Sequence, residues 1–525
     1  MLSAELAPHI VLVVLDTHRR DRLGCYGCPR GTSPNLDAFA QQATIFDTAI
    51  ASAQWTMPAH ASMFSGEPPS VHMALQSSDV LNEHFATLAE CFAGQGYRTV
   101  GFCNNPLVGV LDNGLRRGFD VFFNYCGAFP SARNGSWAGV IGRLGDLSDL
   151  CLSYLRRVSR PIERAFADSN SLFQGALDPF WVPKWTRIAS FKGNTTRSIR
   201  DVVRFVETEM SSPEAQPTFL FVNLMETHLP YSPPSEFRSA FVPAYLQARA
   251  RSFLQALNRR AGDWFTPPEH PFTELEMRAL VEMYDAEVAY QDHLLAGLLR
   301  ALSQPQLRDH TLVVFAADHG EMLGEHQLTG HAYGVHRGLV HVPLLMRLPG
   351  QLSGRRVAAP VSTTWLFHTL LDAAGLTFHN TADGQRVELG DSSLLAAAAG
   401  GQEPEDIVVC EAYAPEFALE VMERRKPALI DQLNCRATYR VSYEGGHRLV
   451  SVEGVDDQLV ALGADGRERQ VEDVGKERHR RRLLAHTKTF LERARARRPH
   501  LSNHRPGHLG DAIVRQRLRD LGYIE

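Results

Sequence analysis

The sequence lacks any apolar run as long as a membrane span, so we expect no transmembrane helix in its 525 residues. It also lacks an excess of positive charge. The formal net charge is −5, which argues against a general nucleic-acid-binding protein. The amino terminus has no basic segment, and its apolar run from Ile10 to Leu15 ends at Asp16. We therefore predict no secretory signal and a cytoplasmic location.

Paired cysteine motifs are nearly absent. Of eight cysteines, only Cys25 and Cys28 have a Cys-x-x-Cys spacing, and no second pair follows. A structural zinc site normally needs four such ligands, so none is expected. Free thiols in a reducing compartment fit this usage better.

The composition is that of a globular protein, with 44% hydrophobic and 22% charged residues. We predict an α/β catalytic domain over residues 1–400, with an insertion at about 128–191, and a smaller α+β subdomain over 401–525. After residue 401, short strands alternate with turn signals such as Glu444-Gly445-Gly446, which predicts a small antiparallel sheet. A helix with a basic exposed face should follow, from about 476 to 497.

Three continuous apolar runs organise the larger domain: His9–Leu15, Phe219–Leu224 and Thr311–Ala316. Such runs are typical of strands buried on both faces of a parallel sheet. Helical segments lie between them, among them 274–302, so a mostly parallel α/β sheet is predicted. A further strand is expected at 341–346, and the stretch 232–273 is expected to be irregular. The basic insertion at 128–191 could be a lid or a helix packed on the core.

Polar residues follow these strands directly. Asp16 ends the first run, His228 lies four residues beyond the second, and Asp318-His319 follows the third. Ligand sites in open α/β sheets lie beyond the carboxyl ends of strands. Carboxylate oxygens and imidazole nitrogens are ligands for divalent metals. Taken alone, Asp16 could equally cap a loop.

The stretch Gln54 to Gly66 has the pattern of a loop that enters a helix, because Pro58 suits the first helical turn. Thr56 would lie near the helix N-terminus, where backbone N–H groups favour an anion. His60 is four residues along and could lie beside Thr56. The alternative is an N-capping threonine with a surface histidine.

Together these stretches predict a site for one divalent metal ion (Mn, Zn, Ca or Mg), held by Asp16, Thr56, Asp318 and His319. A metal would activate the Thr56 hydroxyl as a nucleophile. His60, His228 and His331 would bind the non-bridging oxygens of an ester or protonate its leaving group.

The same residues carry a resemblance to a known family. The chain resembles the sulfatase family of the alkaline phosphatase superfamily through the following stretches: Asp16-Thr17-x-Arg19-x-Asp21, Leu23-Gly24-Cys25-Tyr26-Gly27, Thr32-Ser33-Pro34-Asn35-Leu36-Asp37, Trp55-Thr56-x-Pro58-x-His60, Gly118-Phe119-Asp120, Glu226-Thr227-His228, Asp318-His319-Gly320-Glu321 and Gly330-His331. The resemblance implies a sulfatase-like sandwich around a mostly parallel sheet, with a small carboxyl-terminal antiparallel sheet and helix. His228 matches a substrate-binding histidine of the family, and His331 falls where relatives carry an anion-binding Lys or His.

One departure from the family pattern determines the predicted chemistry. Where active sulfatases resemble Cys-x-Pro-x-Arg or Ser-x-Pro-x-Arg, this chain has Thr56-Met57-Pro58-Ala59-His60. Formylglycine is therefore not expected. A threonine nucleophile is similar to that of phosphodiesterases and phospho-group transferases in the superfamily.

We accordingly predict a hydrolase of phosphate or phosphonate esters, of phosphodiesterase or phosphonate monoesterase type, that uses Thr56 as its nucleophile. Three alternatives stay open: a sulfuric ester hydrolase without formylglycine, a transferase of a phospho-group to a glycan or lipid, and an inactive binding protein. The expected partner is a small anionic ester, which could be glycan- or lipid-linked. Neither nucleic acid nor integral membrane contact is expected, and the sequence does not indicate an oligomeric state.

Overall fold

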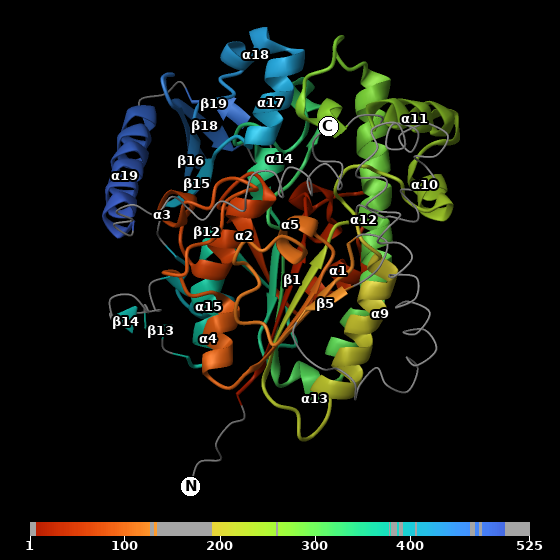
Figure 1. The fold of residues 1–525 in the computed structure, drawn as a ribbon, viewed down its shortest axis with the longest axis vertical. Coiled ribbons are helices and arrows are strands. Elements are labelled where there is room, and N and C mark those ends of the chain that lie inside the picture. Colours follow the sequence, from red (N-terminus) through yellow and green to blue (C-terminus); the bar gives the residue numbers. More distant parts are fainter. Residues whose placement is uncertain are drawn as a thin grey trace, which may run out of the picture.

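The computed structural model describes residues 7–126, 131–133, 192–258, 261–376, 378–379, 386–387, 392–404, 407–462, 468–471 and 475–498. A ten-stranded sheet forms the centre of the molecule (Figure 1). Its strand order is β10 (His341–Val342), β2 (Thr44–Ile50), β11 (Leu344–Arg347), β7 (Thr311–Ala316), β1 (His9–Leu15), β6 (Thr218–Leu224), β3 (Arg98–Cys103), β4 (Val121–Asn124) and β5 (Ser131–Arg133), with β12 (Arg355–Ser362) paired to β2.

The predicted apolar strands form the middle of this sheet. β1 pairs in parallel with both β6 and β7, and every residue of the three strands is buried. Residues that point to either face of these strands are all buried, so neither face needs polar residues. The predicted mixed α/β fold with a mostly parallel central sheet is confirmed.

Helices cover both faces of the sheet (Figure 1). One layer contains α12 (Glu274–Leu302), α9 (Thr195–Phe205) and α1 (Pro34–Ala40), and α12 contacts both of the others. The other contains α2 (Thr56–Ser65), α4 (Leu88–Gly94) and α15 (Leu366–Ala373). The predicted helix at 274–302 has the observed bounds, and a capping box at Thr273 and Glu276 fixes where it begins.

Two local predictions were wrong. The single strand expected at 341–346 is divided at Pro343 into β10 and β11, which both run antiparallel to β2. Proline lacks the N–H that a continuous ladder needs. The irregular stretch expected at 232–273 contains α10 (Ser235–Phe241) and α11 (Ala244–Leu257). Each helix begins directly after a proline, Pro234 and Pro243, whose fixed φ is favourable at a helix start.

The predicted antiparallel sheet near the carboxyl end is also confirmed. It consists of β15 (Val408–Ala412), β16 (Tyr439–Glu444), β17 (His447–Val452), β18 (Gln458–Leu462) and β19 (Glu468–Gln470). The buried carboxylate of Glu411 on β15 accepts hydrogen bonds from the backbone N–H of Ser70 and from Arg440. This contact joins the small sheet to α3 (Pro69–His72), just beyond α2.

The division at residue 400 stays a prediction, and the insertion predicted at 128–191 lies outside the described residues except for 131–133. No helix in the described ranges is long and apolar enough to cross a membrane. The seven cysteines in these ranges form no disulfide.

Candidate active site

Asp16, Asp318 and His319 meet at one edge of the central sheet. Asp16 follows β1 and Asp318-His319 follows β7, and these two strands are parallel neighbours, so their carboxyl ends are adjacent. One potential ligand atom from each of the three side chains lies within 4.8 Å of the others. All three residues are fully buried. This is the arrangement that the strand-end residues predicted.

The buried oxygens of this group fit a bound cation. Asp16 Oδ1 and Asp318 Oδ2 are buried without a hydrogen-bond partner. Burial and the neighbouring Asp318 raise the pKa of Asp16 well above its ordinary value, and burial raises the pKa of Asp318 to about 7. Two carboxylates in a dry site repel each other, and a divalent cation would remove that repulsion.

The Nε2 atom of His319 is positioned to bind a cation together with the two carboxylates. Its Nδ1 lies 2.9 Å from the carbonyl oxygen of Gly320, which fixes the ring and leaves Nε2 on the side of the carboxylates. Burial lowers the pKa of His319, so the neutral imidazole, the form that binds metals, is favoured.

Thr56 lies beside this group. It is the first residue of α2, almost fully buried, and its Oγ1 is 3.3 Å from His319 Nε2. The N-cap of α2 is Trp55, in extended conformation and without a side-chain cap. Thr56 is therefore not the N-cap of this helix, and its hydroxyl faces the carboxylate and imidazole group.

The loop after Asp16 is held in an unusual conformation. Thr17 has φ 56, the left-handed region that a β-branched residue rarely adopts. Tyr284 on α12 donates a hydrogen bond to the Thr17 carbonyl and accepts one from the Arg19 N–H, both at 2.8 Å. The Thr17 hydroxyl donates to the carbonyl of Asp16, so this side chain is turned toward the backbone. These contacts fix where the Asp16 carboxylate lies.

His60 lies beneath the group, among apolar side chains. Its Nδ1 is 3.1 Å from the Thr56 carbonyl oxygen and 3.4 Å from Asp318 Oδ2. The rings of Phe64 and Phe221 contact its imidazole edge to face. Burial lowers the pKa of His60 to about 3, so the ring is neutral. A catalytic role for His60 stays a prediction, and these contacts favour support of Asp318.

His228 and His331 extend the site from His319. The ring centroids of His319 and His331 are 4.4 Å apart, and those of His331 and His228 are 5.1 Å apart. Nδ1 of His228 faces the Leu229 carbonyl oxygen at 2.5 Å. Burial lowers the pKa of both histidines. The structure thus brings together the histidines that the sequence placed far apart.

Three polar residues of the site were not predicted from the sequence. Asn105 donates to Asp16 Oδ2 at 2.5 Å, Asn223 lies 3.4 Å from His60 Nε2, and the buried Glu321 Oε1 is 2.9 Å from His331 Nδ1. Asn105 follows the carboxyl end of β3, so the criterion that found Asp16 could have found it. Asn223 is a polar residue inside an apolar strand, which is a weaker signal.

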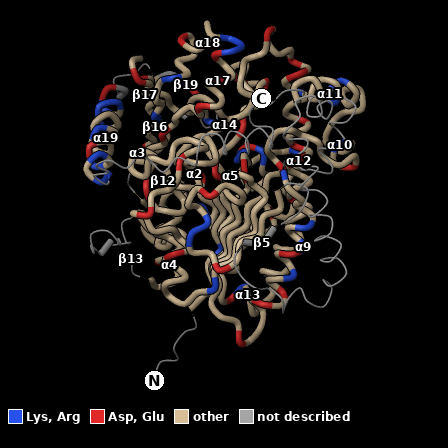
Figure 2. Tube along the Cα trace, viewed as in Figure 1, with Lys and Arg blue, Asp and Glu red and all other residues tan. Residues whose placement is uncertain are grey.

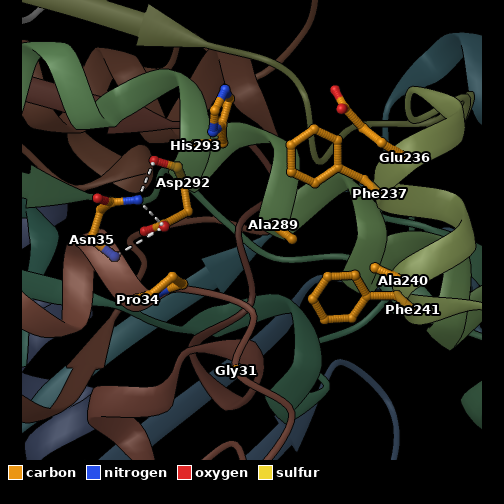
Figure 3. Close-up of a pocket in the computed structure, with 10 residues that line it drawn as sticks. All are labelled: Gly31, Pro34, Asn35, Glu236, Phe237, Ala240, Phe241, Ala289, Asp292 and His293. Atoms are coloured by element: carbon orange, nitrogen blue, oxygen red, sulfur yellow. Dashed lines mark hydrogen bonds between the residues drawn. The ribbon is translucent and has the colours of Figure 1, made fainter.

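A separate pocket of about 420 Å³ lies between α10, α12 and the start of α1 (Figure 3). Its lining includes Phe237, Phe241 and Asp292 but no residue of the carboxylate and imidazole group. The two oxygens of Asp292 accept hydrogen bonds from the backbone N–H groups of Asn35 and Leu36 and from the Asn35 side chain. Asp292 thus caps α1, and its carboxylate is already satisfied.

The raised pKa of Asp318 predicts a pH-dependent stability in the absence of divalent ions. The folded protein binds this proton more tightly than the unfolded chain, whose carboxyl has a pKa of 3.8. The resulting stabilisation is present below that value and is lost as the pH rises through about 7. We expect metal-free Asp318→Asn protein to gain melting temperature relative to wild type between about pH 5 and about pH 8. An exposed control, Asp456→Asn, should show no such trend, and a pH-independent difference for Asp318→Asn would contradict the assignment.

Comparisons with known proteins agree with this geometry. The sequence profile of the sulfatase family matches residues 8–376. Iduronate 2-sulfatase of Homo sapiens is 26% identical over 374 residues, which cover 66% of this chain and 60% of that protein. The uncharacterized sulfatase YidJ of Escherichia coli strain K12 is 22% identical over 389 residues, which cover 72% of this chain and 70% of that protein. The chain thus spans about three fifths of the length of iduronate 2-sulfatase.

Solved structures share the fold. Phosphonate monoester hydrolase of Agrobacterium radiobacter superposes with a TM-score of 0.60 at 22% identity, covering 93% of this chain and 95% of that one. BT4656, solved with D-glucosamine-2-N,6-O-disulfate, gives a TM-score of 0.61 at 16% identity, covering 95% of this chain and all of that one. Because the family profile extends from β1 to the end of α15 and includes Asp16, Thr56, Asp318 and His319, the chain belongs to the sulfatase family.

Proposed function

We propose that this protein is a metal-dependent hydrolase of phosphate or phosphonate esters, with Thr56 as its covalent nucleophile. The observation that carries the proposal is the position of the Thr56 hydroxyl, 3.3 Å from His319 Nε2. That nitrogen is itself 3.4 Å from Asp318 Oδ2, a buried oxygen without a hydrogen-bond partner. Relatives with sulfatase names share the family, but this chain has a threonine where formylglycine formation needs cysteine or serine.

Asp16, Asp318, His319 and Thr56 would hold one divalent cation. Mn, Zn, Ca and Mg are all compatible with this set of oxygen and nitrogen donors. When bound, the cation would supply positive charge that lowers the pKa of the Thr56 hydroxyl and neutralises charge on the ester. Asn105 holds one Asp16 oxygen, which leaves the other oriented toward the group.

The proposed reaction has two displacements at phosphorus. Thr56 Oγ1 gives up its proton to solvent and attacks, the Oγ1–P bond forms, and the P–O bond to the alcohol breaks. The alcohol leaves after taking up a proton from His228 or His331. Water then attacks the same phosphorus, the Oγ1–P bond breaks, and Oγ1 takes up a proton from that water, which restores Thr56. The phosphate monoester, phosphate or phosphonate is released, and the histidine that protonated the alcohol takes up a proton from solvent.

His228 and His331 would bind the non-bridging oxygens of the ester. Both imidazoles are neutral when buried without substrate. An incoming anion would favour their protonation, because an opposite charge nearby stabilises the charged form. Glu321 would then stabilise the His331 imidazolium through its contact with Nδ1. The substrate would be a small anionic ester, which could be linked to a glycan or a lipid.

A sulfuric ester hydrolase is the second candidate, because membership of the sulfatase family favours it. A threonine sulfate ester cannot expel its sulfate by collapse to an aldehyde, so water would have to attack at sulfur. Transfer of a phospho-group to an acceptor would follow the first displacement proposed above, with the acceptor hydroxyl in place of water. Product analysis with and without an added alcohol separates transfer from hydrolysis.

Removal of one carboxylate should weaken metal binding. We expect Asp16→Asn to weaken Mn²⁺ or Zn²⁺ binding by about 100-fold or more, since even second-shell changes cost 10–100-fold. Isothermal titration calorimetry of metal-free protein measures this effect, with Asp456→Asn as the exposed control. Equal affinity in Asp16→Asn and wild type would exclude the proposed site.

Replacement of the nucleophile should stop turnover. We expect Thr56→Ala to lower kcat for a chromogenic phosphodiester by about 1,000-fold or more, and Thr56→Ser to retain part of the activity. Peptide mass spectrometry of wild type during turnover should find a phosphate or phosphonate adduct on Thr56. The exposed Thr208→Ala is the control. Full turnover by Thr56→Ala, or release of sulfate alone from the matching aryl sulfate, would refute the proposal.

Glu321 should act through His331. We expect Glu321→Gln to lower kcat/KM by about 10–100-fold, as is typical of residues that orient a functional histidine. His331→Ala should also lower activity, and the double variant should lose little more than His331→Ala alone, since the two residues act as one unit. Additive losses in this cycle would show that Glu321 acts independently, and unchanged metal affinity would separate its role from that of the ligands.

A further inference from the structure

The helix α19 (Gly475–Arg497) is rich in positive charge. Over residues 477–498 there are nine Lys and Arg against two Glu, a net charge of +7 in a chain whose total is −5. Figure 2 shows these basic positions along α19 at the outer flank of the molecule. The other residues together carry a net charge of −12, so α19 is opposite in sign to the rest of the chain taken as a whole.

The two sides of α19 differ in composition. Leu483, Thr487 and Ala494 are buried, and the helix contacts β16, β17 and α3. The exposed side presents Arg478, Lys488, Arg493 and Arg495, together with Glu492. Within the described residues, no ion pair involves these four cations. Their charge is therefore available to a partner.

Other basic side chains fasten the helix in place. Arg482 pairs with Glu444 on β16 at 2.8 Å, and Arg497 pairs with Glu67. Arg498 donates to the carbonyl of Ser70 on α3 at 2.6 Å. The carboxyl end of α19 is thus bound to the segment that directly follows α2, the helix that begins with Thr56. A ligand on α19 would meet a rigid surface.

We propose that the exposed side of α19 is a docking surface for an anionic polysaccharide. Guanidinium groups form paired hydrogen bonds with sulfate and carboxylate groups, and their spacing along a helix of about 35 Å suits a flexible charged chain. The inference concerns binding alone and does not depend on the proposed hydrolytic function.

The structure favours this occupant over two other anionic partners. A membrane-surface helix needs large apolar side chains toward the lipid, and none of the large exposed apolar residues in the described ranges lies on α19. A duplex is usually read by a helix that enters a major groove about 8.5 Å deep, whereas α19 lies along a sheet with one side covered. Its exposed side also lacks the aromatic residues on which single-stranded bases stack.

The test uses the full chain on immobilised heparin, a sulfated polysaccharide, with elution by a salt gradient. One variant carries Arg478→Gln, Lys488→Gln, Arg493→Gln and Arg495→Gln. A control of equal charge change carries Arg204→Gln, Arg249→Gln, Arg251→Gln and Arg300→Gln, four exposed arginines on other helices. We expect wild type and control to be retained and to elute at similar salt, and the α19 variant to elute much earlier.

Parallel measurements determine the class of partner. Wild type should bind soluble heparin at least about tenfold more tightly than duplex DNA of matched charge or vesicles with phosphatidylserine, at the same ionic strength. Equal elution of the α19 variant and the control would overturn the docking surface. Tighter binding to DNA or to vesicles would overturn the polysaccharide as its occupant. Circular dichroism spectra and melting temperatures, both unchanged, establish that the variants are folded.

Discussion

Two buried carboxylates that repel each other determine the form of this site. Asp16 and Asp318 end neighbouring parallel strands, so their side chains meet in a region from which water is excluded. The pKa values of both groups are raised because burial, and for Asp16 also the neighbouring Asp318, disfavours the charged form. A protein retains such a pair only where something compensates, and a divalent cation is the compensation that the donor atoms fit. The surrounding residues are organised so that the carboxylates cannot move apart.

That organisation uses contacts from distant parts of the chain. Tyr284 on the long helix α12 holds the backbone of the loop after Asp16, and Thr17 is kept in a left-handed conformation. Asn105 occupies one Asp16 oxygen, and the backbone N–H groups of Thr17 and His319 occupy one Asp318 oxygen. In each carboxylate one oxygen is thereby fixed and the other is left without a partner. The two neighbouring histidines are held in the same way, through one ring nitrogen each. Glu321 contacts Nδ1 of His331, and the Leu229 carbonyl contacts Nδ1 of His228.

The small carboxyl-terminal sheet has a part in this architecture beyond its own stability. Glu411 on β15 holds the start of α3, and α19 is tied to the same segment through Arg497 and Arg498. The helix α2, which positions Thr56, is therefore enclosed by the central sheet on one side and linked to the small sheet beyond its carboxyl end. The basic helix α19 and the buried site at Thr56 are therefore linked through the short segment of chain that follows α2 and contains Glu67 and Ser70.

The sequence by itself determined the elements whose signal is local. The apolar runs of β1, β6 and β7 and the capped helix at 274–302 were predicted because burial on both faces and capping leave a pattern within a few residues. The strand-end rule likewise placed Asp16, Asp318 and His319 together. Only the tertiary structure decided that His60 is turned inward between two phenylalanines, that Asn105 holds Asp16, and that Glu321 orients His331. The physical reason is that the direction of a side chain, and the partner it meets, depend on strand register and helix packing. Those are fixed by contacts between distant segments, such as Asn105 with Asp16, 89 residues apart, which no local pattern encodes.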